Sequence, residues 1–591
     1  MICRSRLQNM THISLKSFRL IAVALFATTV AGPVFAQEAL PEIATGRSGP
    51  KSGTTKSYMV VAANPIAGKA GTDILAAGGS AADAAIAVQL VLNMVEPQSS
   101  GIGGGAFALY WDAKAQKVAS YDGREMSPAA AEENRFLTKD GKPMGRLQAM
   151  VGGKSVGVPG VVRLMELLHQ RHGKLPWAKL FEPAIAIADN GFAISPRMNA
   201  LLASDPSFKA NPTAHAYYYE ADGSPKAVGT VLKNPAFAKV LRAIAAKGAD
   251  GFYTGEVAAD IVRTVTTATN NPADMTLADL KTYKAIERPP VCGMYRTYKI
   301  CGMGPPSSGG IGVIETLGVL SKFDLRSMGA QSATSEHLLI EAGRLALADR
   351  AVYLADPDKI SVPTEALIAP DYLKHRAELV SVDKRMADAP AGKVPVKAGL
   401  NLITAPSPEL PSTSHFSIVD AEGNALAMTT SVEAQFGSRL MVDGFVLNNQ
   451  LTDFSYQDVA EKRTVANRVE GGKRPRSSMS PTLVFNADGK FEMALGSPLG
   501  AAIVGLVVKT LVGMIDFQLS PADAAAAPGA LFTGNGVTIE EGLEPIKPAL
   551  EALGHQVRVG EFASGIHVIR VTKDGLVGGA DPRREGEVLG K

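Results

Sequence analysis

The stretch PSTSHFSIVD (residues 411–420) marks the sharpest change of pattern along the chain. Before it, residues 385–412 are rich in proline and irregular, which is typical of a flexible segment. After it, residues 414–419 and 425–432 alternate apolar with polar positions around the turn DAEGN, which predicts a β-hairpin. Helical patterns dominate as far as about residue 380. A helix-rich part therefore leads through a flexible segment into a strand-rich part.

Thr413 stands where the flexible segment meets the first predicted strand. A threonine hydroxyl alone is a poor nucleophile, and no obvious triad surrounds this one. An N-terminal threonine can use its own α-amine as the base, because that amine has a pKa of about 8. An internal threonine gains such an amine only if the preceding peptide bond is cut. The position suggests cleavage between Ser412 and Thr413, although many threonines at strand starts have no chemical role.

The first 36 residues have the pattern of a secretory signal peptide. They contain four basic residues and no acidic residue, followed by an apolar run over residues 20–30, with Val34 and Ala36 at the −3 and −1 positions. The run is shorter than the roughly 20 residues that a membrane anchor needs. We therefore predict export to the periplasm or the medium, with residues 37–56, which are polar and rich in glycine, proline and serine, as a mobile leader.

The charge balance excludes some partners. The 591 residues contain 60 basic and 57 acidic side chains, a net charge of +3. Removing the signal peptide leaves 555 residues with 56 basic against 57 acidic side chains, a net charge of −1. No basic stripe with aromatic residues remains, which argues against a nucleic-acid partner. No later run is long enough to span a membrane.

Two cysteines remain after signal removal, Cys292 and Cys301, and they flank a predicted hairpin. An oxidising compartment would permit a disulfide between them, and two small buried thiols are the alternative. Two cysteines alone do not make a zinc site, so no metal is predicted.

Several spaced motifs resemble the γ-glutamyltranspeptidase family of self-cleaving N-terminal-nucleophile hydrolases. The resemblance covers roughly residues 57–590, in one order along the chain. Its motifs are EPQSSGIGGGAF (96–107), DGREMSPA (122–129), GPPSSGG (304–310), ADRAVYLADPD (348–358), TSHFSIVD (413–420), GNALAMTTSVEAQFGS (423–438), LNNQLTDFS (447–455), KRPRSSMSPT (473–482) and DPR (581–583).

The resemblance implies an α/β fold, an αββα sandwich built jointly by two subunits of one precursor. Thr413 would attack the carbonyl of Ser412, and hydrolysis would leave a large subunit, residues 37–412, and a small subunit, residues 413–591, as a heterodimer. Thr413 would then take the γ-glutamyl group of glutathione or a related donor as an ester and pass it to water, an amino acid or a peptide. No cofactor is implied.

The resemblance also assigns the remaining site residues. Ser431 would support the nucleophile, and the backbone N–H groups of Leu499 and Gly500 would form the oxyanion hole. The donor's α-carboxylate and α-ammonium would be bound by two sets of side chains: Arg124, Ser477 and Ser478 for the carboxylate, and Glu433, Gln450 and Asp453 for the ammonium. His415 receives no catalytic role and is predicted to be structural.

Four departures from the family pattern keep alternatives open, one of which is Thr452 in place of the first acid of the common Asp-Asp pair. Ser431 stands in place of a threonine, and Leu499 in place of a glycine, where a positive φ would strain the leucine. Residues 456–472 are shorter than in members with a lid loop over the site. A more open site would suit a cephalosporin (glutaryl) acylase, a relative with the same fold. An exported homologue without activity is the third hypothesis.

Overall fold

The computed structural model describes residues 49–397, 400–405, 412–456, 464–532 and 536–591. The predicted signal peptide and most of the predicted leader lie outside the described residues. Two seven-stranded antiparallel sheets pack face to face. The first has the order β21 (Glu587–Gly590), β2 (Met59–Ala62), β10 (Ser414–Val419), β11 (Ala425–Ser431), β3 (Gly105–Asp112), β4 (Lys117–Gly123) and β7 (Ile286–Arg288). The second has the order β1 (Lys51–Thr55), β20 (Gly575–Ala580), β19 (His567–Thr572), β15 (Phe491–Gly496), β14 (Thr482–Phe485), β9 (Tyr298–Gly302) and β8 (Val291–Tyr295).

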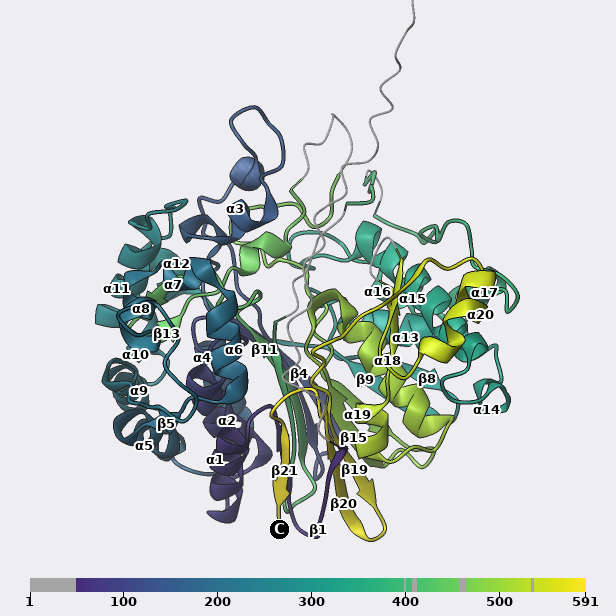
Figure 1. The fold of residues 1–591 in the computed structure, drawn as a ribbon, viewed down its shortest axis with the longest axis horizontal. Helices are drawn as coiled ribbons and strands as arrows, with labels where there is room; N and C mark the ends of the chain where they lie inside the picture. Colours follow the sequence, from purple (N-terminus) through teal and green to yellow (C-terminus); the bar gives the residue numbers. More distant parts are fainter. Residues whose placement is uncertain (1–48, 398–399, 406–411, 457–463, 533–535) are drawn as a thin grey trace, which may run out of the picture. The chain divides into compact units, whose positions relative to one another are not determined.

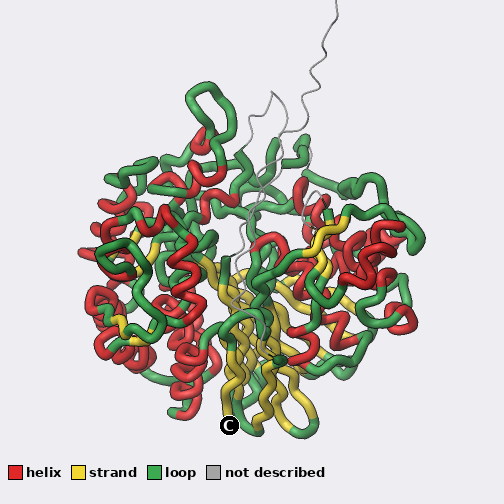
Figure 2. The backbone as a smooth tube through the Cα atoms, viewed as in Figure 1, coloured by secondary structure: helices red, strands yellow, loops and turns green. Residues whose placement is uncertain are grey.

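Helices cover the outer face of each sheet, which gives four layers (Figures 1 and 2). Against the first sheet lie α1 (Pro65–Ala76), α2 (Ala81–Val95) and α4 (Val161–His172), flanked by α5 (Glu182–Asn190), α9 (Pro235–Lys247) and α11 (Gly255–Thr266). Against the second lie α13 (Gly309–Leu320), α18 (Ile503–Ile515) and α19 (Pro521–Ala526), with α15 (Ala333–Tyr353) and α17 (Pro370–Glu378) packed on α13. The predicted αββα sandwich is confirmed.

Strand β10 is buried on both faces because it lies in the middle of this sandwich. Phe416 and Ile418 belong to the hydrophobic core under α2. Residues of the opposite parity face the second sheet, where Ser417 Oγ donates to the carbonyl of His567 at 3.2 Å. A centrally paired strand holds its backbone rigidly, and Thr413 is the residue immediately before it.

The predicted mobile leader is wrong for its last residues. Residues 51–55 form β1, an edge strand that pairs antiparallel with β20, Lys51 lying opposite Ala580. The sequence KSGTT is polar and gives no strand signal, because an edge strand exposed on one side needs no apolar alternation. Its structure comes from backbone pairing and from Lys51 Nζ, which donates to the carbonyl of Gly586 at 2.8 Å.

The described part of residues 385–412 contains no helix or strand, as its composition indicates. It is nevertheless tied to α15 and its surroundings. Gly392 N–H donates to Asp349 Oδ1 at 2.6 Å, and Ala405 N–H donates to the carbonyl of Ala351 at 3.2 Å. Flexibility of this segment stays a prediction.

Cys292 and Cys301 form a disulfide between β8 and β9, where they lie opposite each other in register. This settles the choice between a disulfide and two thiols that the sequence left open. Among the described residues, no helix combines the length and the apolar character required to cross a membrane.

Candidate active site

Thr413 presents its hydroxyl to the peptide bond that precedes it. Both Ser412 and Thr413 are buried, and Thr413 Oγ1 lies in close contact with the carbonyl oxygen of Ser412. Ser412 is fixed in turn, because its own hydroxyl donates to the carbonyl of Gln98 at 2.7 Å. The nucleophile proposed from the sequence therefore lies beside the bond that it would have to attack.

Ser431 is brought to Thr413 by the register of the hairpin. Ser414 on β10 pairs with Thr430 on β11, which puts Ser431 beside Thr413. Thr413 Oγ1 donates to Ser431 Oγ at 3.2 Å, and Ser431 Oγ donates to the Ser412 carbonyl oxygen, also at 3.2 Å. The N–H of Glu433 donates to Ser431 Oγ at 2.8 Å. Ser431 thus bridges the attacking hydroxyl and the oxygen on which negative charge would develop.

A small cavity collects most of the predicted site residues. It is lined by Ser412, Thr413, Ser431, Glu433, Gln450, Asp453, Ser477, Met479, Gly500 and Ile503. Its volume is about 10 Å³, which is room for about one water molecule. In the uncut chain the cavity therefore has no space for a ligand the size of an amino acid. Arg124, Ser478 and Leu499 do not line it.

Arg124 lies directly behind this cavity, at the end of β4, and is fully buried. Its Nη2 donates to Asp453 Oδ2 at 2.5 Å and to the carbonyl of Arg476 at 2.8 Å. The neighbouring Glu125 carboxylate lies 3.6 Å from Arg124 Nη1, and burial raises the pKa of Glu125 to about 7 despite that positive charge. A ligand carboxylate at Arg124 would share the guanidinium with Asp453.

Two carboxylates that line the cavity, those of Glu433 and Asp453, accept hydrogen bonds from neighbouring amides. Gln450 Nε2 donates to Asp453 Oδ2 at 3.0 Å, and Asn449 Nδ2 donates to Glu433 Oε2 at 2.5 Å. Two carboxylates beside one cavity are suited to a cationic group such as an ammonium. These residues come from the short η4 helix (Gln450–Asp453) and the turn after β11.

The Ser477-Ser478 segment is held by a serine pair that the sequence analysis did not assign to the site. Ser477 N–H donates to the carbonyl of Pro306 at 3.1 Å, and the Ser308 N–H and hydroxyl donate to the Ser477 carbonyl at 2.7 and 2.8 Å. Ser307 donates to the carbonyl of Met479 at 2.7 Å. The GPPSSGG motif, quoted above only as part of the resemblance, therefore supports this wall of the cavity.

Arg584 is a further residue of the site that the sequence did not reveal. Its Nη1 donates to the carbonyl oxygen of Thr413 itself at 2.7 Å. The only signal in the sequence is its place directly after the DPR motif.

Leu499 has the positive φ that would strain a leucine. Its φ is 101°, and that of Gly500 is 52°. Gly500 reaches the cavity, whereas the Leu499 side chain is buried in the core under α18. A leucine in this backbone conformation costs on the order of 1–2 kcal/mol, and core packing of its side chain offsets that cost.

We expect L499G to be at least as stable as L499A. At an ordinary position alanine is more stable than glycine by about 0.5–1 kcal/mol, but at this φ an added Cβ is strained. Urea unfolding of both variants measures the difference. The matched pair L506A and L506G, in helix α18, should show the usual advantage of alanine. The same advantage at position 499 would show that the backbone there is unstrained.

His415 lies between the sheets rather than in the cavity. Its Nδ1 is 2.9 Å from Thr429 Oγ1, its Nε2 is 3.2 Å from Ser417 Oγ, and its ring stacks on that of His567. Burial lowers the pKa of His415 well below its ordinary range and lowers that of His567 to about 3. Both imidazoles are neutral, which agrees with the structural role predicted for His415.

These two histidines should make the fold sensitive to acid. Below pH of about 6.5 the unfolded chain binds protons that the buried rings do not, so stability is lost as the pH falls from 6.5 toward 3. Each buried histidine contributes up to about 1.4 kcal/mol per pH unit in that window. Urea unfolding between pH 7 and 4.5 should show a smaller pH slope in H567L than in wild type. H375Q, on an exposed ring, should keep the wild-type slope.

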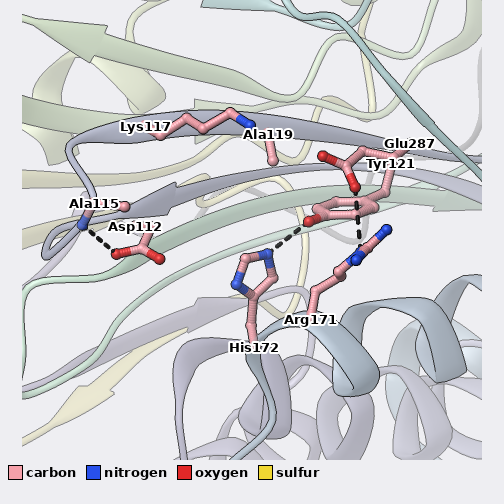
Figure 3. Close-up of a pocket in the computed structure, with 8 residues that line it drawn as sticks. All are labelled: Asp112, Ala115, Lys117, Ala119, Tyr121, Arg171, His172 and Glu287. Carbon is pink, nitrogen blue, oxygen red and sulfur yellow. Dashed lines mark hydrogen bonds and ion pairs between the residues drawn. The ribbon is translucent and has the colours of Figure 1, made fainter.

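A larger cavity, of about 410 Å³, shares no residue with the site around Thr413 (Figure 3). It lies between the β3–β4 hairpin and the end of α4. Its polar side chains already bond to neighbours: Tyr121 OH is 2.6 Å from His172 Nε2, Arg171 pairs with Glu287, and Asp112 accepts from the N–H of Ala115. Apart from Lys117, the polar side chains that line this larger cavity are engaged with neighbours, and the cavity contains none of the predicted site residues.

An αββα sandwich with a threonine hydroxyl at the start of a central strand defines an N-terminal-nucleophile hydrolase. Comparison with known proteins gives the family. The chain belongs to the γ-glutamyltranspeptidase family, whose profile matches residues 67–591.

Two curated relatives and one solved structure are examples of the proteins to which this chain is similar. The glutathione hydrolase proenzyme of Bacillus subtilis is 34% identical over 549 residues, which is 90% of this chain and 92% of the relative. The acylase ACY 1 proenzyme of Pseudomonas sp. (strain SE83) is 32% identical over 550 residues, covering 92% of this chain and 94% of the relative. The crystal structure of cephalosporin acylase from Bacillus halodurans matches with a TM-score of 0.80 and 25% identity, covering 93% of this chain and 99% of that one.

Proposed function

We propose that this protein is an exported, self-processing γ-glutamyl hydrolase and transpeptidase, with Thr413 as the nucleophile. The observation that carries the proposal is the contact between Thr413 Oγ1 and the carbonyl of Ser412, in a chain whose relatives are proenzymes. An ordinary strand-initiating threonine has no need to face its own preceding peptide bond.

The first reaction is cleavage of the chain. Thr413 Oγ attacks the Ser412 carbonyl carbon and loses its proton, and the carbonyl oxygen becomes an oxyanion beside the Ser431 hydroxyl. The C–N bond then breaks, the Thr413 nitrogen takes the proton and becomes a free amine, and an ester remains. Water hydrolyses the ester and leaves subunits 37–412 and 413–591 as a heterodimer.

The second reaction uses the new amine. It accepts the proton of the Thr413 hydroxyl as that oxygen attacks the γ-glutamyl amide, and the departing amine of the donor takes the proton. The N–H of Gly500, with that of Leu499, would stabilise the oxyanion. Water, an amino acid or a peptide then releases the γ-glutamyl group from Thr413. Glutathione and related γ-glutamyl compounds are the proposed donors.

The charges around the cavity support a donor with a free amino-acid head. Arg124, Ser477 and Ser478 would bind its α-carboxylate, and Asp453, Glu433 and Gln450 its α-ammonium. A glutaryl group has no ammonium, so it would leave the carboxylates of Asp453 and Glu433 facing a neutral methylene, which is costly at a buried site.

Cephalosporin acylase activity is the second candidate. It is favoured by the acylase relative and by the similarity to the Bacillus halodurans acylase structure. The short segment 456–472 also motivated it, but residues 457–463 lie outside the described residues.

One experiment separates these functions. The purified mature protein is run on a denaturing gel and assayed with γ-glutamyl-p-nitroanilide beside glutaryl-7-aminocephalosporanic acid. We expect two chains and a preference for the γ-glutamyl substrate. The opposite preference would establish the acylase, and a single uncut band that leaves both substrates untouched would indicate an inactive binding homologue.

Export is proposed on the signal-peptide pattern alone. In a fractionated bacterial host the protein should be found in the periplasm or medium, and Edman sequencing of its large subunit should begin at Gln37. A large subunit that retains residues 1–36 would contradict export by cleavage.

A further inference from the structure

Arg584 lies in the segment between β20 and β21 and reaches into the site from the C-terminal end of the chain. Its side chain is buried, with an exposed fraction of 2%. Nε donates to the carbonyl of Ala563 at 2.9 Å, and Nη1 donates to the carbonyl of Thr413 at 2.7 Å. A buried guanidinium is costly unless it is paired or hydrogen-bonded, and here one of its hydrogen bonds goes to the nucleophile's own residue.

We propose that Arg584 is a positioning residue of this reaction: its buried charge keeps the new α-amine of Thr413 unprotonated, so that the amine can accept the hydroxyl's proton. The proposal rests on the proposed cleavage, because that amine exists only after the Ser412–Thr413 bond is cut. An α-ammonium has no lone pair and cannot act as the base.

The distance between the two groups is short by covalent geometry. The nitrogen and the carbonyl oxygen of one residue are three bonds apart, or about 3–3.6 Å. The nearest guanidinium nitrogen, 2.7 Å from that oxygen, is therefore within roughly 6 Å of the amine. A unit charge at that distance, at an effective dielectric constant of about 20, lowers an amine pKa by roughly one to two units.

The other charged groups near Thr413 are two carboxylates that act in the opposite direction, two arginines that are each paired with a carboxylate, and two neutral histidines. Glu433 and Asp453 line the same cavity, and their carboxylates would favour the ammonium form, although Arg124 is bonded to Asp453. His415 and His567 are neutral. The neighbouring Asp581 is paired with Arg583 at 2.9 Å. Arg584 is thus the cation that offsets the two carboxylates at the amine.

Arg584 already influences a second group in this region. The pKa of His567 is lowered to about 3, mainly by burial and further by the Arg584 charge. Lys51 on β1 also contributes to that lowering, but it bonds to Gly586 and has no bond to Thr413. Lys51 therefore offers a matched control, a second cation that acts on His567 but is not bonded to Thr413.

The test is the pH dependence of kcat/KM for γ-glutamyl-p-nitroanilide in processed wild type, R584Q, R584K and K51Q. The acid limb of this profile reports the base of the free enzyme. We expect R584Q to move the acid limb upward by about one pH unit, with activity recovered at high pH. R584K and K51Q should leave the limb in place.

A second readout needs no substrate. Cyanate carbamylates unprotonated α-amines, so its rate against pH, followed by mass spectrometry of the small subunit, gives the amine pKa directly. A cut wild type that is inactive on every donor would refute the proposed activity, while this titration would still test Arg584. An unchanged limb and amine pKa in R584Q, an R584Q chain that stays uncut, or an uncut wild type would each overturn the role of Arg584.

Discussion

Replacing Thr413 with alanine is expected to leave the protein as one uncut chain without turnover. The substitution removes the Thr413 hydroxyl, which lies against the Ser412 carbonyl, and with it both the acyl shift and the later ester. Loss of a nucleophile of this type lowers kcat by about 10⁴-fold or more. A denaturing gel and a γ-glutamyl-p-nitroanilide assay measure the two effects.

Two control variants show whether the effect of T413A is specific to the Thr413 hydroxyl. T413S keeps a hydroxyl and should still be cut and active. T430A makes the same change on β11, at a buried threonine whose hydroxyl donates to Gly105 at 3.4 Å, and it should be processed normally. Cleavage or turnover that persists in T413A would mean that another residue is the nucleophile.

The second large effect is expected from D453N. Removing the charge of Asp453 takes away an acceptor for the donor's ammonium, which is worth about 2–4 kcal/mol for a charged hydrogen bond in a buried site, or roughly 30- to 1,000-fold in kcat/KM. This loss of kcat/KM should be seen with γ-glutamyl substrates. Glutaryl substrates lack the ammonium, and Arg124 keeps its charge and stays available for their carboxylate.

The ratio of the two kcat/KM values is the informative measurement, because D453N also removes one carboxylate partner of the buried Arg124 and lowers stability. Thermal unfolding monitors that part separately. D488N makes the same change at an exposed turn between β14 and β15 and should alter neither substrate. An equal loss of kcat/KM on both substrates would indicate that Asp453 supports the fold rather than the recognition of the ammonium.

Local patterns determined the parts of this site that neighbouring residues build. The turn between β10 and β11 sets the register, and the register places Ser431, which the resemblance assigned to the site, beside Thr413. The motif resemblance supplied Arg124, Glu433, Gln450, Asp453 and Ser477 by position, and the structure brings these side chains together at or directly behind one cavity. Their roles stay proposals.

The tertiary structure decided what distant segments do to one another. Polar residues 51–55 become a strand only because β20 offers them a free edge, and Arg584 reaches Thr413 across 171 positions of sequence. The φ of 101° at Leu499 is likewise seen only in the folded chain, where the leucine side chain is buried in one core with α18. The sequence alone located the Thr413 hydroxyl at the start of a predicted strand, because periodicity and turn chemistry are local. It could not show which buried charge lies beside that residue, because that contact depends on how remote segments pack.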